Sequence, residues 1–209
     1  MKRIITIILA AAAAVSLFGS CSLFKGPISD AQAEEILGEL LPEAAILNTY
    51  IWGDAVKTAK TVDEEDESST VSVYYTVSSD CRYHNTDEFK DDVMKYYSAE
   101  MAEIISEYAF ENSDTTRSRF CNLYDDSMNV IDMQVDVTKN HEPFVLTAVA
   151  LPETVKVKRS TETIIEATLT TLAGEDRKEN EIKIRLLYEN ERWRLDSYNW
   201  IAAVEYTNG

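Results

Sequence analysis

Residues 85–110, NTDEFKDDVMKYYSAEMAEIISEYAF, carry the strongest helical pattern in the chain. Asn85 suits the N-cap, and the two acids that follow Thr86 suit the positive end of the helix dipole. Apolar residues then recur at helical spacing, namely Phe89, Val93, Tyr96 or Tyr97, Met101, Ile104, Ile105 and Tyr108. Ser98 followed by Glu100 is compatible with a second cap and a bend. The stripe predicts one long helix whose apolar face must be covered by a sheet.

Most of the sequence after this segment has the pattern of β-strands. The candidate strands are 119–124, 128–137, 144–150, 154–158, 163–172, 181–188 and 193–197. In 181–188, Ile182 and Ile184 flank Lys183, so one face of the sheet meets solvent. Asp125-Asp126-Ser127 predicts a tight turn. Helices first and antiparallel strands last predict a single α+β domain over 29–209.

Before the long segment, the sequence predicts two shorter helices and a strand. Ser29 and Gln32 have the spacing of a capping box. Pro42 cannot donate to the preceding turn, so we expect the first helix to break or kink there. Residues 57–70 contain five consecutive acids and predict a solvated acidic loop. A short strand over 71–77 follows this loop.

The first 20 residues have the order of an export signal: Lys2 and Arg3, an apolar run, then small residues. The run is shorter than the roughly 20 residues that a stable membrane span needs. Phe18-Gly19-Ser20-Cys21 resembles the bacterial lipobox, in which the cysteine receives a diacylglyceryl group and becomes the mature N-terminus. Phe18 stands where that motif usually has leucine. The resemblance implies a lipoprotein signal peptide over 1–20 and a lipidated tether over 21–28. The alternative is an ordinary signal peptide with a cysteine nearby.

The implied location is the extracytoplasmic face of the cell membrane, with the protein held by lipid on Cys21. If the host has an outer membrane, the serine after the lipid cysteine permits sorting to it.

The chain is strongly acidic, with 20 Lys and Arg against 37 Asp and Glu over 209 residues. Segment 1–20 holds two basic residues and no acid, so the rest has 18 basic against 37 acidic residues, a net charge of −19. Such a field repels nucleic acid and anionic lipid, which excludes a nucleic-acid-binding function. Basic proteins, cations and neutral glycans remain open as partners. The 45% apolar share predicts a packed domain rather than disorder.

Three cysteines fit the same compartment. With Cys21 used for the lipid, Cys81 and Cys121 can form a disulfide or remain two buried thiols, and the sequence leaves both open. Cys81, His84 and Asp87 are too small a set to predict a metal site, so we expect no metal or cofactor.

The sequence shows no convergent catalytic set. The adjacent pair Asp125-Asp126 points apart in a turn, which favours a structural role over paired glycosidase acids. The aromatic residues are more informative. Tyr96 and Tyr97 are neighbours on a helix and cannot both point inward, so one of them faces a pocket or a partner. Tyr83 and Trp200 complete the candidate contact residues.

Three stretches, 47–54 (LNTYIWGD), 89–110 and 193–197 (WRLDS), resemble predicted lipoproteins of clostridia-like Gram-positive bacteria. That group has no known activity, so it implies no catalytic residue. More distantly, the order of elements is similar to the nuclear transport factor-like (cystatin-like) roll. There a long helix lies in the concave face of a curved antiparallel sheet. A fainter likeness is to an extracellular inhibitor family of bacilli that acts on cell-wall DL-endopeptidases. Seven candidate strands exceed what a simple roll requires.

We therefore expect a membrane-anchored, non-catalytic module that binds a protein, a wall glycan or a wall peptide at the cell envelope. Two alternatives stay open. An envelope hydrolase needs a polar cleft with two carboxylates about 5–9 Å apart. A roll that binds a small apolar molecule needs an enclosed apolar pocket between helix and sheet.

Overall fold

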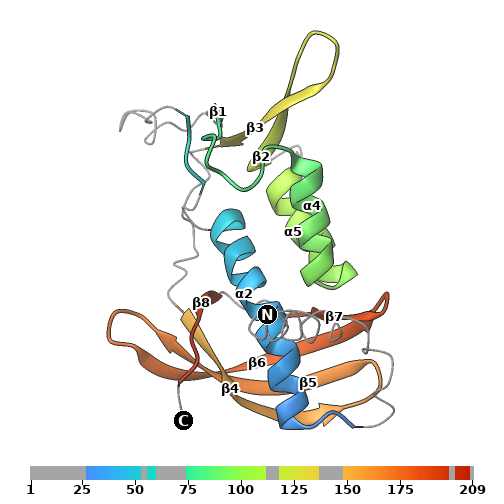
Figure 1. Ribbon diagram of the computed structural model, residues 1–209, viewed down its shortest axis with the longest axis vertical. Coiled ribbons are helices and arrows are strands. Elements are labelled where there is room, and N and C mark those ends of the chain that lie inside the picture. The colour runs from blue at the N-terminus through green and yellow to red at the C-terminus, as the bar shows by residue number, and fades with distance from the viewer. Residues whose placement is uncertain are drawn as a thin grey trace, which may run out of the picture.

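The computed structural model describes residues 27–52, 56–59, 74–111, 118–136, 148–197 and 201–207. The described part has an α+β architecture, as the sequence predicts. Helix α2 (Asp30–Ile51) runs from a large sheet to a small sheet, and α4 (Thr86–Tyr96) and α5 (Ala99–Phe110) lie near the small sheet (Figure 1). The predictions for residues 1–20, for Cys21 and for the acidic loop from residue 60 onward concern residues outside the described ranges.

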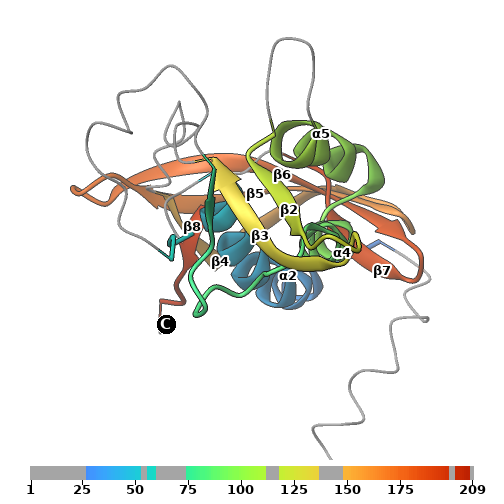
Figure 2. The ribbon, with the colours of Figure 1, turned by 90° about the horizontal axis from the view of Figure 1, so that it is seen from above.

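The strands form two sheets instead of the single sheet expected. The small sheet has the order β1-β3-β2, with β1 (Tyr74–Thr76), β2 (Phe120–Tyr124) and β3 (Val130–Asp136). The large sheet has the order β7-β6-β5-β4-β8 and is curled (Figure 2). Its strands are β4 (Ala148–Ser160), β5 (Ile164–Ala173), β6 (Lys178–Glu189), β7 (Arg192–Leu195) and β8 (Ile201–Val204). Only the pairing of β4 with β8 is parallel within the described part of this sheet.

Two details of the large sheet differ from the predicted strands. β4 is continuous where the sequence predicted two strands separated by Pro152. The register shifts after Leu151, and there the Thr154 hydroxyl accepts a 2.8 Å hydrogen bond from the Thr170 N–H. A bulge of this kind accommodates a proline that cannot join the ladder. β8 was missed because four residues with two alanines carry little β propensity.

Helix α2 passes through Pro42 without interruption, so a helix break at this proline is wrong. Its N-terminus has the predicted capping box, in which Ser29 N–H donates to Gln32 Oε1 at 2.9 Å. A proline inside a helix costs about 3 kcal/mol. Burying one leucine side chain gives about 1.5–3 kcal/mol. Leucines 0% exposed stand on both sides of the proline, at Leu41 and Leu47, and this packing outweighs the cost.

Segment 85–110 forms two helices because its middle pairs with the large sheet. Tyr97 and Ser98 are extended, and Ser98 caps α5. Ser98 N–H donates to the Leu195 carbonyl at 2.8 Å, and Tyr97 makes a parallel bridge to Leu195. The Ser98 hydroxyl donates to Asp196 Oδ1 at 2.5 Å. The bend that the sequence allowed at Ser98 is therefore a complete break, made by contact with the end of β7.

The apolar stripe of α4 and α5 is buried as predicted, but its partners differ. Phe89, Val93, Met101 and Ile105 are at most 5% exposed. Helices α4 and α5 contact each other and β2, and α4 also contacts α2 and β7. The helix that lies on β4 and β8 is instead α2. The predicted contact of the 85–110 stripe with the large sheet is thus confined mainly to β7.

Phe89 is the centre of an aromatic cluster that joins five parts of the fold. Its ring stacks on Tyr83 with centroids 4.3 Å apart and an interplanar angle of 4°. Phe110 of α5 and Phe120 of β2 each lie 5.2 Å from it, and Tyr50 of α2 lies 6.1 Å away. This cluster fixes α4 against α2, α5 and the small sheet.

Candidate functional site

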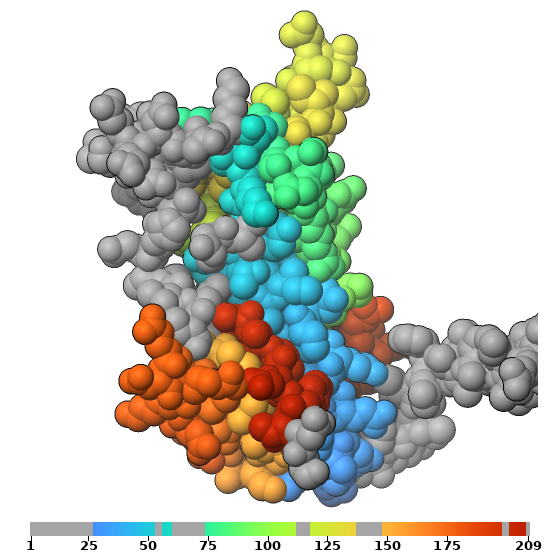
Figure 3. Space-filling model, turned by 60° about the vertical axis from the view of Figure 1, so that its left-hand side comes forward, coloured from blue at the N-terminus to red at the C-terminus, as the bar shows by residue number. Residues whose placement is uncertain are grey.

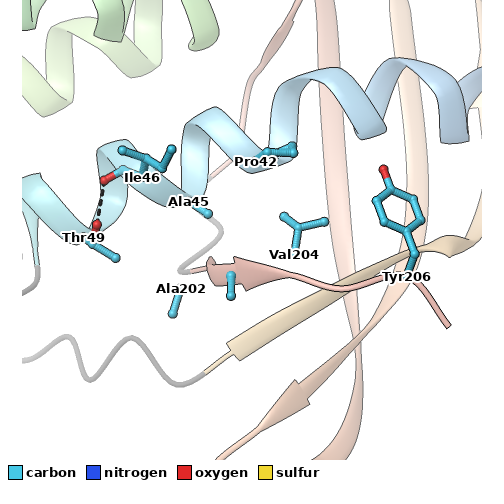
Figure 4. Close-up of a pocket in the computed structure, with 8 residues that line it drawn as sticks. Pro42, Ala45, Ile46, Thr49, Ala202, Val204 and Tyr206 are labelled. Atoms are coloured by element: carbon cyan, nitrogen blue, oxygen red, sulfur yellow. Dashed lines mark hydrogen bonds between the residues drawn. The ribbon is translucent and has the colours of Figure 1, made fainter.

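An open groove of about 330 Å³ runs between the C-terminal half of α2 and strand β8. Pro42, Ala45, Ile46 and Thr49 line it from α2, and Ala202, Ala203 and Val204 line it from β8 (Figure 4). Most of the lining side chains are aliphatic. The Thr49 hydroxyl donates back to the Ile46 carbonyl at 2.7 Å, so it is already hydrogen-bonded within the helix. In Figure 3, β8 and α2 lie side by side at the molecular surface.

Tyr206, just after β8, lines both this groove and a second hollow of about 420 Å³. Glu34, Glu35 and Gly38 of α2 contribute to the second hollow. A Cβ on Gly38 would lie 2.6 Å from the Tyr206 hydroxyl, so the ring can approach the helix only where glycine stands. Burial and the nearby Glu34 and Glu153 raise the pKa of Tyr206.

The surroundings of the second hollow are acidic. Helix α2 carries five acids, Asp30, Glu34, Glu35, Glu39 and Glu43, and no Lys or Arg. Asp30 and Glu43 are paired with Lys156 and Arg82 respectively. Within the described part of the chain, the three remaining glutamates of this helix make no salt bridge.

Glu153 on β4 adds a further carboxylate near Tyr206. One of its oxygens accepts a 2.8 Å hydrogen bond from the Thr207 N–H. Desolvation opposes ionisation of this group, but the hydrogen bonds from Thr207 bring the pKa of Glu153 below its ordinary value. Its other oxygen is buried and has no hydrogen-bond partner among the described residues. The groove thus has an apolar part and an adjoining part in which Glu34 and Glu35 have no cationic partner among the described residues.

Two of the tyrosines singled out from the sequence belong to the core. Tyr97 and Tyr83 are each 3% exposed. The Tyr97 hydroxyl donates to Asn48 Oδ1 at 2.6 Å, and the Tyr83 hydroxyl donates to Asp92 Oδ2 at 2.7 Å. Both side chains hold helices together and present no surface to a partner.

The other two predicted aromatic contact residues are Tyr96 and Trp200. Tyr96 is the half-buried neighbour, and the Lys95 ammonium lies 4.8 Å from the centre of its ring. Tyr97 is thus the buried member of the pair, but it is extended at the C-cap of α4, so the argument from neighbours on a helix does not apply to it. Trp200 lies outside the described residues. Sequence reasoning missed Tyr206, which is 49% exposed at the groove, because no local pattern signals its contact with α2.

Raising the pH above about 10 is expected to destabilise the protein through the two core tyrosines. Desolvation raises the pKa of Tyr97 and of Tyr83, and the hydrogen bond to Asp92 adds to the effect on Tyr83. The unfolded chain then loses protons that the folded chain keeps. The free energy of unfolding should fall by up to about 1.4 kcal/mol per pH unit for each tyrosine, whereas below pH ~10 the contribution is fully present.

Urea unfolding between pH 9 and pH 11.5 measures this slope. The Tyr83→Phe/Tyr97→Phe double variant should lose less stability over the interval, whatever its stability at neutral pH. The Tyr124→Phe variant, at a position 46% exposed, serves as the control and should follow the parent protein. Equal slopes in the parent and the double variant would contradict the assignment.

Cys81 and Cys121 are both free thiols in the structure. The Cys81 sulfur donates to the Lys57 carbonyl at 3.4 Å, and the Cys121 sulfur lies 3.9 Å from Gln134 Oε1. Burial, with a smaller effect of Asp136, raises the pKa of the Cys121 thiol, which disfavours the nucleophilic thiolate.

The remaining polar candidates have structural partners. His84 Nδ1 lies 2.8 Å from Asp132 Oδ1. In the part of the chain that the structure describes, no three His, Cys, Asp or Glu side chains form a group that could hold a metal ion. Asp125 caps its own turn by accepting from the N–H groups of Ser127 and Asn129 at 2.8 and 2.9 Å, as the turn prediction requires.

No helix within the described ranges has both the length and the apolar character needed to cross a bilayer. No protein-family model matches the chain, and no curated protein shows significant similarity to it.

Proposed function

We propose that this protein is a lipid-anchored extracytoplasmic module that binds a partner at the cell envelope without catalysis. The observation that carries the proposal is the open groove between α2 and β8, with its apolar lining and adjoining acids. A wide groove at the surface suits an extended partner such as a protein segment, a wall peptide or a glycan. The strong negative charge argues against nucleic acid.

The proposed anchor on Cys21 fits the way the chain enters the domain. Ile28 N–H donates to the Ser160 hydroxyl at 2.8 Å, which ties the entry point to the far end of β4. The tether from Cys21 to Ile28 adds about seven residues after the cysteine, which span at most roughly 25 Å when fully extended. Helix α2 rises from there for 22 residues, or about 33 Å. The lipid would keep the large sheet near the membrane and direct the small sheet away from it.

We also assign the large sheet and α2 to the cystatin-like roll. In support, the large sheet is curled, and the longest described helix contacts β4 and β8. The small sheet β1-β3-β2 is then an addition beside α4 and α5, which accounts for the surplus of strands over a simple roll. An experimental structure of the domain in which no helix packs against the curled sheet would rule out this assignment.

A small apolar molecule is the second candidate ligand. The apolar lining and the volume of about 330 Å³ favour it. The groove is open to solvent, however, and a site that buries a small molecule is normally more enclosed. We therefore rank an extended partner first. A hydrolytic activity has no corresponding cluster of carboxylates in the groove itself.

Site-specific photo-crosslinking in cells that make the full chain tests the proposal. A photoreactive residue at position 49 lies in the groove, whereas one at Glu181 lies on β6, three strands away from β8. We expect a discrete crosslinked species from position 49 that is absent from position 181. The species should disappear when Ile46→Glu places a charge in the groove. Crosslinks of equal pattern from both positions, or none from position 49, would exclude the groove as the binding site.

A further inference from the structure

We infer that the groove binds an extended peptide that is apolar in one half and carries Lys or Arg in the other, and that this peptide pairs with the free edge of β8. The inference rests on the proposed function and names the chemical class of the partner. Three observations carry it: the edge position of β8, the apolar part of the groove, and the unpaired carboxylates beside Tyr206.

Strand β8 is the last strand of the large sheet in the described part of the chain. Glu205 N–H donates to the Ala150 carbonyl at 2.9 Å, so this residue faces β4. Backbone groups alternate in direction along a strand. The N–H and C=O of Val204 therefore point away from β4, where an added strand can bind them.

The groove beside this edge has room for apolar side chains. Ala45, Ala202 and Ala203 are small, and they leave the volume of about 330 Å³ open between helix and strand. Ile46 and Tyr206 are 39% and 49% exposed, which is high for large apolar side chains. A peptide strand laid along β8 would cover both of them and bury its own alternate side chains in the groove.

Charge selects the other half of the peptide. Beyond Tyr206 the hollow presents Glu34 and Glu35, which make no salt bridge among the described residues. An ammonium or guanidinium group of the peptide would pair with these two carboxylates. A second copy of this chain would bring a chain of net charge −17 to the same place, and a small apolar molecule would leave both the edge and the acids unused.

The binding of synthetic peptides to the detergent-solubilised mature protein tests the inference by fluorescence anisotropy. The probe is acetyl-Val-Thr-Val-Thr-Lys-Thr-Lys-amide, together with its reversed sequence because the strand direction is open. The first control replaces both lysines by glutamate. The second control methylates the backbone nitrogens of alternate residues and so removes the donors that face β8. We expect one of the two lysine peptides to bind at least tenfold more tightly than either control.

Protein variants separate the two parts of the site. Glu34→Gln/Glu35→Gln should reduce the preference for lysine over glutamate peptides to less than about threefold. The matched control Glu103→Gln/Glu107→Gln removes the same charge from exposed positions on α5 and should leave the preference unchanged. Ala203→Trp should fill the groove and abolish binding, with circular dichroism as the check on folding.

Equal affinity for lysine and glutamate peptides, or full binding of the methylated peptide, overturns the inference. So does failure of both lysine peptides to bind. Saturable binding of a fatty acid in their place assigns the groove to small apolar molecules, and a concentration-dependent dimer in sedimentation assigns it to a second copy. Each of these results leaves the crosslink from position 49 as an independent test of the proposed function.

Discussion

Replacing Phe89 by alanine is expected to lower the free energy of unfolding by about 3–5 kcal/mol. Phe89 is 0% exposed and lies within 6.1 Å, centroid to centroid, of four other aromatic rings. The substitution removes the apolar contact area and leaves a cavity that neighbours from different elements cannot jointly fill. Because domains of this size are stable by only about 5–15 kcal/mol, the variant should lose a large part of its stability.

Chemical denaturation followed by tryptophan fluorescence measures the loss. Met94→Ala is the matched control, since Met94 lies on the same helix and is 54% exposed, and it should change stability by no more than about 0.5 kcal/mol. Phe89→Leu should fall between the two, because a leucine keeps part of the apolar contact. If the free energy of unfolding of Phe89→Ala lies within about 1 kcal/mol of the parent value, the aromatic cluster is not the point at which α4 is held.

Local features were predictable because short-range contacts decide them. The Ser29 capping box, the Asn85 cap and the turn at Asp125 each depend on residues within four positions in the chain. The alternation of Ile184 with Arg185 on β6 likewise predicted which side chains are buried. For such features, the residue types and their spacing contain nearly all of the determining chemistry.

The features that sequence reasoning missed depend on partners far along the chain. The break at Ser98 exists because Leu195 and Asp196 bind its backbone and side chain. The uninterrupted helix at Pro42 depends on packing against strands more than a hundred residues later. Strand β8 is held by its parallel pairing with β4, which no local propensity reveals. Periodicity identifies a strand but does not specify its neighbour.

The candidate site belongs to this second class. Gly38 reads locally as a weak point in a helix, yet it is the place where Tyr206 approaches the backbone. Tyr83 and Tyr97 are predicted contact residues by their aromatic character alone, but hydrogen bonds to Asp92 and to the buried Asn48 make them core residues. A groove between two elements far apart in sequence can be located only once their packing is known.

Replacing Cys21 by alanine is expected to leave the protein either unprocessed, with residues 1–20 still attached, or cleaved and released. In the cleaved protein the membrane-bound share should fall roughly a hundredfold or more. Each buried CH₂ of an acyl chain contributes about 0.8 kcal/mol, and stable anchoring needs at least two chains or a second attraction. Apart from residues 1–20, the chain offers no such second attraction. Its 18 basic and 37 acidic residues give a net charge of −19, which an anionic surface repels.

Cell fractionation with intact-mass measurement decides the question, because acylation adds a defined mass to an N-terminus that begins at residue 21. Cys121→Ala is the matched control and should remain in the membrane with its lipid, since a half-buried thiol on β2 cannot take the place of an N-terminal cysteine. A Cys21→Ala protein that is still cleaved after Ser20 and still sediments with membranes would refute the lipid anchor. The orientation proposed for α2 would then lose its basis. The groove between α2 and β8 would remain, because its geometry depends on contacts within the folded domain alone.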